Sequence, residues 1–144
     1  MSAIQGFCHL FGINGRTLSR EENFILEAEL LVRVCGELKE IFRVQYKNYF
    51  KLMSFTIEME NTMLEENFIR LIIKDILSTQ EYTLQGIAHY TATHEDVVHE
   101  VMIGKNTNPS ASLLRRMIEL HRLVRRDLYQ NIAKKITEDC LAVA

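Results

Sequence analysis

Residues 83–104 read TLQGIAHYTATHEDVVHEVMIG, and the elements expected elsewhere in the chain can be placed around them. Two short helices joined by a turn of three or four residues fit this pattern. Ala88 would lie where the two helices cross, and Val98 and Val101 would face back onto the first helix. The stretch therefore predicts a helix-turn-helix.

Helical patterns also lie on both sides of this motif. From residue 61 the apolar residues repeat every three or four positions, which predicts a helix that starts at a capping box beginning with Thr62 and ends near Ser78. Thr83 and Thr93 are expected to cap the two helices of the motif. Beyond the single proline, Ser110 is expected to start the last helix.

The last predicted helix is long, at roughly 25 residues, and carries an apolar stripe along one face. It is longer than a small helical domain needs, so the part beyond Tyr129 predicts a contact between two copies of the chain. The residues expected to take part in this dimerisation are Val124, Leu128 and Ile132.

The N-terminal part of the chain has weaker signals. Residues 1–19 combine helical spacing with the tight-turn dipeptide Asn14-Gly15, and they support no single prediction. A capping box that begins at Ser19 predicts a short helix from about Arg20.

Alternating apolar and polar residues predict β-structure between about residues 30 and 59, with residues 47–49 closing a hairpin. The alternation is carried by Phe42, Val44 and Tyr46, and again by Met53, Phe55, Ile57 and Met59. We therefore expect a small antiparallel β-sheet of two or three strands ahead of the helical region, which makes the predicted fold class α+β, mostly α.

Charge is unevenly distributed along the 144 residues, although the net charge is only −2. Residues 58–100 hold nine acidic and two basic side chains, whereas residues 105–136 hold eight basic and two acidic ones. If the protein binds a polyanion, the C-terminal third is the electrostatic candidate. Two solvated faces of opposite sign, or a self-complementary dimer, would explain the asymmetry equally well.

Several classes of protein are not favoured by the sequence. Its apolar runs are much shorter than the roughly 20 residues of a membrane span, and without a signal-peptide pattern a cytoplasmic protein with no membrane contact is expected. The cysteines Cys8, Cys35 and Cys140 suit buried apolar positions better than a disulfide framework. No catalytic constellation or cofactor motif is present. A metal site is not expected either, since the histidines of residues 89–99 lie five apart and point away from one another on a helix.

The spacing of the central motif resembles that of a known family. Three segments carry the match: Thr83-Leu84-x-x-Ile87-Ala88, Val98-x-x-Val101-x-x-Gly104 and Pro109-Ser110-x-x-x-Leu114. They closely resemble the helix-turn-helix of the phage lambda-repressor and Cro-like DNA-binding domains, over about residues 61–126. The resemblance implies a five-helix lambda-repressor-like bundle whose second motif helix lies in the major groove of operator DNA, bound by a dimer.

The resemblance also implies a set of DNA-contacting positions. The nucleic-acid-binding residues expected from it, together with the cations that would hold phosphates, are Thr83, His94, Glu95, Asp96, Val97, His99, Glu100, Lys105, Arg115 and Arg116. Two positions depart from the family pattern: Ala92 stands where glycine is usual in the turn, and Thr93 replaces an apolar residue.

The acidic residues of the second motif helix leave two functions open. Carboxylates repel phosphates, although Glu or Asp can accept a hydrogen bond from the cytosine amino group. One hypothesis is a dimeric transcriptional regulator, with residues 1–60 as a dimerisation or regulatory element and residues 61–144 binding double-stranded DNA. The alternative is a protein–protein interaction module, resembling an antirepressor or antitoxin, that binds a protein partner on its acidic helix.

Overall fold

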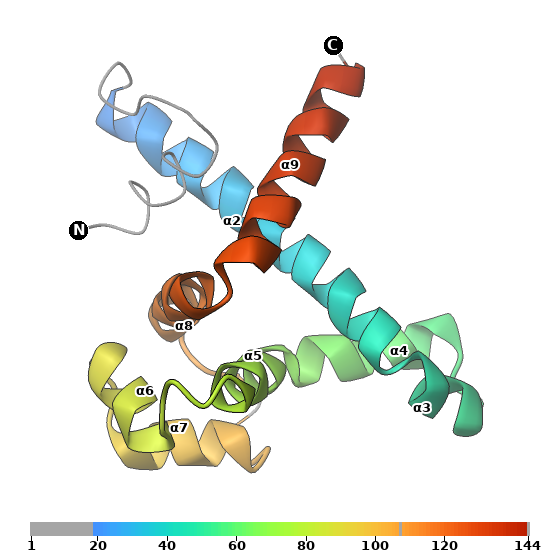
Figure 1. The fold of residues 1–144 in the computed structure, drawn as a ribbon, viewed down its shortest axis with the longest axis vertical. Helices are drawn as coiled ribbons and strands as arrows, with labels where there is room; N and C mark the ends of the chain where they lie inside the picture. The colour runs from blue at the N-terminus through green and yellow to red at the C-terminus, as the bar shows by residue number, and fades with distance from the viewer. Residues whose placement is uncertain (1–18, 107, 144) are drawn as a thin grey trace. The chain divides into compact units, whose positions relative to one another are not determined.

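The computed structural model describes residues 19–106 and 108–143, and every regular element in these residues is an α-helix (Figure 1). The described helices are α2 (Arg20–Gln45), α3 (Lys47–Leu52), α4 (Ile57–Glu66), α5 (Phe68–Ser78), α6 (Leu84–Tyr90), α7 (Glu95–Met102), α8 (Ala111–Val124) and α9 (Arg126–Val143). None of them combines the length and the apolar character that crossing a bilayer requires. The Asn14-Gly15 dipeptide and Cys8 lie outside the described residues, and Cys35 is half-buried in α2.

The predicted antiparallel β-sheet is wrong, because α2 continues through its first expected strand. The buried residues of this segment repeat every four positions along the helix and are Leu30, Val34, Leu38 and Phe42. Val44, which should share a buried strand face with Phe42, is 72% exposed. The four-residue period that buries one helix face therefore outweighs the two-residue alternation.

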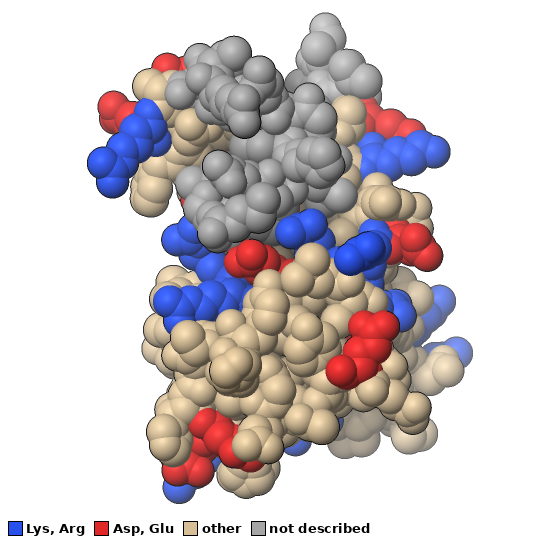
Figure 2. Space-filling view, turned by 60° about the vertical axis from the view of Figure 1, so that its left-hand side comes forward, with Lys and Arg blue, Asp and Glu red and all other residues tan. Residues whose placement is uncertain are grey.

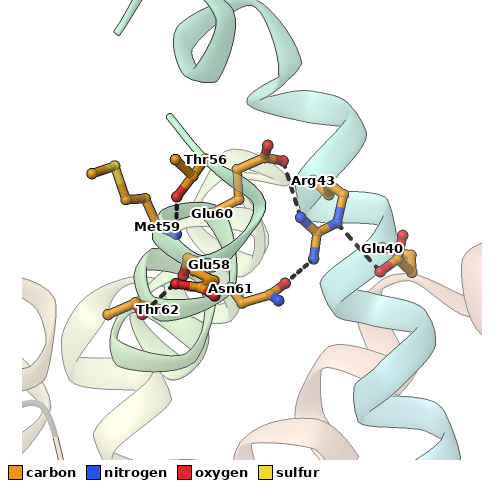
Figure 3. Close-up of polar contacts among 8 residues, drawn as sticks. All are labelled: Glu40, Arg43, Thr56, Glu58, Met59, Glu60, Asn61 and Thr62. Carbon is orange, nitrogen blue, oxygen red and sulfur yellow. Dashed lines mark hydrogen bonds and ion pairs between the residues drawn. The ribbon is translucent and has the colours of Figure 1, made fainter. Parts of the chain in front are cut away.

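The second expected strand is also helical or turn, and its alternating residues are not buried as a set. Met53, Ile57 and Met59 are exposed, so the alternation marks no buried face. Instead α3 ends at Leu52, and Ser54 shortly after it has a φ of 54°. Thr56 then caps α4 by accepting a hydrogen bond from the Met59 N–H at 3.2 Å (Figure 3). The expected cap Thr62 lies inside α4, where its hydroxyl donates to the Glu58 carbonyl.

Arg43 ties the end of α2 to α4 (Figure 3). Its Nη1 lies 3.0 Å from Glu60 Oε1, its Nη2 donates to Asn61 Oδ1, and its Nε contacts Glu40 at 3.3 Å within α2. The planar guanidinium can satisfy these acceptors at once because its donors diverge in a fixed fork. Phe42, one residue earlier, packs edge-on against Phe68 with ring centroids 6.2 Å apart.

The described residues fall into two compact units. In the unit of residues 38–124, α5 is the most buried helix, with six of its 11 residues in the core. It packs against α7 and α8, while α6 packs against the same two helices (Figure 1). One polar pair crosses this apolar interior: fully buried His121 on α8 donates from Nε2 to Asp75 Oδ2 on α5 at 2.6 Å.

The apolar stripe expected on one long C-terminal helix is divided between two helices. Ser110 caps the first, α8, since its hydroxyl accepts from the Leu113 N–H at 3.1 Å as the sequence predicted. Arg125 separates α8 from α9 and its carbonyl accepts from Tyr129 N–H. Residues 19–37, which include the first part of α2, and residues 125–143, which include α9, are the described part of the other unit, in which Lys135 Nζ lies 2.8 Å from Glu37 Oε2. Ser19 caps α2 as expected, accepting from Glu22 N–H.

Replacing Gly36 with alanine should stabilise the protein. Gly36 lies exposed inside α2, and a Cβ built there meets nothing within 4 Å. Alanine lowers the backbone entropy of the unfolded chain, so the free energy of unfolding should rise by about 0.5–1 kcal/mol in urea denaturation. Gly104→Ala is the matched control of opposite sign, because Gly104 has a φ of +80°. A loss of stability in Gly36→Ala would show that α2 is not continuous at this residue.

The Asp75–His121 pair should be strongly coupled. Asp75→Ala removes an acceptor from a fully buried imidazole and should cost about 2–4 kcal/mol. A double-mutant cycle with His121→Leu should give a coupling energy above about 1 kcal/mol, whereas the more exposed Lys39–Glu65 pair should give less. Equal coupling in the two cycles would contradict a structural role for the buried pair.

Candidate functional site

The first helix of the motif is fixed by its cap and by two buried residues. Thr83 Oγ1 accepts from Gly86 N–H at 3.0 Å, which confirms the predicted cap. Ile87 and Ala88 are buried on the side of α6 that packs against α7 and α8. Thr83 is exposed, but its hydroxyl is already engaged as an acceptor by the helix it caps.

The turn between α6 and α7 is a left-handed helix ending. Ala92 N–H donates to the His89 carbonyl and Thr93 N–H to the Ala88 carbonyl, which is the pair of bonds of a Schellman motif. Ala92 has a φ of 51°, so alanine occupies a position that favours glycine. The preceding residue, Thr91, is fully buried, and its hydroxyl donates to the carbonyl of Ile87. The turn therefore has one defined geometry despite its lack of glycine.

Helix α7 begins one residue later than the expected Thr93 cap. His94 is the N-cap residue, and its Nδ1 accepts from the Asp96 N–H at 3.2 Å. Glu95 and Asp96 occupy the first turn, where carboxylates interact favourably with the positive end of the helix dipole. Three residues expected to contact DNA thus also stabilise the start of α7.

The outer face of α7 is a mixture of charged and uncharged side chains. Glu95, Asp96 and His99 are exposed, while Val97 and Glu100 are half-buried. Val98 and Val101 point inward and are buried. In Figure 2 the lower part of the view is mostly uncharged, with acidic groups and some Lys or Arg side chains near its edges. This face therefore offers specific acceptors rather than a broad cationic surface.

The three expected phosphate-binding cations differ in their surroundings. Lys105 is exposed directly after α7. Arg116 Nη1 donates to the Thr91 carbonyl at 2.9 Å, so this side chain fastens α8 to the turn of the motif while part of it stays exposed. Arg115 is half-buried and has an interaction partner within the chain. The sequence indicated these cations as phosphate contacts but contained no sign that Arg116 bonds the turn 25 residues earlier.

Tyr90, the last residue of α6, has surroundings that disfavour the ionised form of its phenol. Burial raises the pKa of its phenol above the usual value, and the nearby Glu119 carboxylate and Tyr82 add to this effect. The Tyr82 and Tyr90 rings pack edge to face with centroids 6.4 Å apart. This is the edge-to-face geometry that aromatic pairs favour.

The residues expected at a dimer contact are not equally accessible. Val124 and Leu128 are half-buried, whereas Ile132 is buried with only 3% of its surface exposed. Their role in dimerisation stays a prediction. Among the residues that the structure describes, no group of three or more His, Cys, Asp or Glu side chains has the geometry to hold a metal ion.

The turn provides a test of the motif's geometry. Ala92→Gly should raise the free energy of unfolding by about 1 kcal/mol, because glycine removes the steric cost of a left-handed residue. Ala28→Gly, at an exposed position inside α2, should instead lower it. Both values can be measured by urea denaturation. A destabilising Ala92→Gly would contradict the left-handed turn between α6 and α7.

Comparisons with known proteins add no further constraint on this site. No family model, curated protein or solved structure matches the chain. The function of α6, α7 and α8 is therefore inferred from their own residues and geometry.

Proposed function

We propose that the protein is a DNA-binding transcriptional regulator that acts as a dimer through α6 and α7. The observation that carries this proposal is the exposed row of α7, formed by Glu95, Asp96 and His99, which projects from two helices joined by a rigid turn. A helix presented in this way has the dimensions to enter the major groove of double-stranded DNA. Glu95 and Asp96 would accept hydrogen bonds from cytosine amino groups, while His99 adds a donor or acceptor one helical turn further on.

Cations beside α7 support this proposal. Lys105 follows the helix directly, and the exposed part of Arg116 lies beside the turn that precedes it. Because affinity for DNA comes largely from neutralised phosphates, these side chains would have to offset the carboxylates on the reading helix. Such an interface would bind weakly to random sequences and would gain affinity at sites where the carboxylates find donors.

A second function, a protein–protein interaction module, is favoured by the exposed acids themselves. Glu95 and Asp96 lie at the tip of α7, and neither forms an ion pair with a lysine or arginine of the described residues. A basic segment of a partner protein would pair with these carboxylates without the repulsion that phosphates meet. The helix-turn-helix would then serve as a rigid support for the acidic helix.

The two functions predict different effects of neutralising the acids: a change in DNA affinity for the regulator, and loss of a protein partner for the interaction module. If α7 docks on DNA, the double variant Glu95→Gln with Asp96→Asn should bind random duplex DNA severalfold more tightly in fluorescence anisotropy, because two repulsive charges are removed. Lys105→Ala should bind more weakly and lower the slope of log K against log salt by about 1 between about 50 and 200 mM salt.

The control changes equivalent acids at the start of another helix. Glu21 and Glu22 occupy the first turn of α2, so Glu21→Gln with Glu22→Gln makes the same charge change on a different helix. DNA binding that responds equally to both double variants, or not at all to Lys105→Ala, would rule out docking through α7. Loss of a basic protein partner on neutralising only the α7 acids would then favour the interaction module.

A further inference from the structure

A cavity of about 210 Å³ lies at the opposite end of α7 from its acidic tip. It is bounded by the start of α5, the end of α7 and the segment that leads to α8. Its polar lining includes Lys39, Glu65, Asn67, Arg70, Asn106 and Asn108. This volume is below the roughly 300–1,000 Å³ of pockets for drug-sized ligands, so it suits a small molecule.

Arg70 is the cation of this cavity whose N–H donors are incompletely satisfied by hydrogen-bond acceptors. Its Nε is buried and has no hydrogen-bond partner, and its Nη1 reaches Asn67 Oδ1 only at 3.4 Å. No carboxylate among the described residues forms an ion pair with it. A guanidinium cannot lose its proton at ordinary pH, so the buried Nε donor stays charged and unsatisfied until an acceptor reaches it.

The neighbouring Lys39 is already neutralised. Its Nζ lies 2.7 Å from Glu65 Oε1 and 5.3 Å from the centre of the Phe68 ring. The carboxylate of Glu65 is therefore engaged by Lys39 and does not compensate Arg70. The other carboxylate of the lining, Glu66, is exposed and forms no ion pair with Arg70 among the described residues, so the Arg70 guanidinium has no paired anion.

Backbone geometry keeps the guanidinium accessible. Gly104 ends α7 with a φ of +80°, and a Cβ at this residue would lie 3.4 Å from Arg70 Nη1. Most other residues would be strained at this φ, and their side chains would crowd the guanidinium. Asn106 lines the same space, and since its Oδ1 accepts from Asn108 N–H, its amide nitrogen is left to donate to an oxyanion. Asn67 Nδ2 already donates to the Met63 carbonyl at 2.9 Å.

We propose that this cavity binds the carboxylate or phosphate group of a small molecule, with Arg70 as its main ligand-binding residue. Guanidinium groups hold both kinds of oxyanion through paired, charge-assisted hydrogen bonds. Val101 and Gly104 of the α7 end belong to the cavity wall, so a bound oxyanion stabilises the helix that carries the exposed row. This binding does not depend on whether α7 contacts DNA.

The test uses the full chain with inorganic phosphate and with succinate as separate probes, at constant ionic strength in chloride buffer. Calorimetric titration should show saturable binding of at least one probe, and binding should be at least about tenfold weaker in Arg70→Met. The ¹⁵N–¹H signal of Arg70 Nε should shift on binding in the unsubstituted protein. Binding of phosphate alone identifies a phosphorylated ligand, and binding of succinate alone identifies a carboxylate ligand.

Lys74→Met is the matched control, since Lys74 is an exposed cation one turn along α5. It should bind the probes as the parent does. Equal loss in both variants, or equal binding in all three proteins, would overturn the proposal because the anion effect would then be non-specific. Absence of saturable binding by either probe would overturn it as well. If Arg70→Met does not fold, Arg70→Lys can replace it, because lysine keeps the positive charge but lacks the paired N–H donors of the guanidinium. A Nε signal of the unsubstituted protein that does not move during the titration would also overturn the proposal.

Discussion

The arrangement of α6, α7 and α8 depends on the burial of α5. Ile72, Ile73 and Ile76 have no exposed surface, and a helix with so much apolar area is stable only when other helices cover it. Helices α7 and α8 provide this cover, and the Asp75–His121 bond crosses the contact with α8. Apolar packing tolerates small rotations, whereas a hydrogen bond of 2.6 Å between a fully buried imidazole and a half-buried carboxylate does not. The pair therefore fixes the face of α8 that meets α5, and with it the position of Arg116 beside the turn.

Local backbone chemistry then sets the angle between α6 and α7. The Schellman bonds around Ala92 reverse the chain within a few residues, and Arg116 adds a bond from α8 to the same turn. The acids at the start of α7 take part in this local order, since they lie at the positive end of the helix dipole. Their presence is thus explained in part by the stability of α7, and a binding role must be demonstrated by a charge change that is compared with an equivalent helix start.

Features that depend on neighbouring residues could be predicted from the sequence. The caps at Ser19, Thr83 and Ser110 follow from hydrogen bonds that reach only three residues along the chain. The predicted sheet is wrong because the four-residue stripe from Leu30 to Phe42 is the buried face of this segment, whereas Val44, Met53, Ile57 and Met59 of the alternating pattern are exposed. Gly36, of a residue type common just beyond helix ends, lies exposed inside α2 and does not end it. The Arg116–Thr91 and Asp75–His121 bonds join residues far apart in sequence, and no periodicity encodes such a contact.

The same distinction applies to the Arg70 cavity, which is formed by residues from distant parts of the chain. Helix α7 has eight residues and is therefore only about 12 Å long, so its acidic tip and its cavity end move as one rigid element. Its buried residues Val98 and Val101 allow little independent motion of either end. An oxyanion bound at Arg70 would consequently restrict the exposed row of α7, whether that row faces nucleic acid or protein. The two ends of α7 would thus respond to different chemistry: the cavity end to an oxyanion bound at Arg70, and the acidic end to a partner that binds its carboxylates.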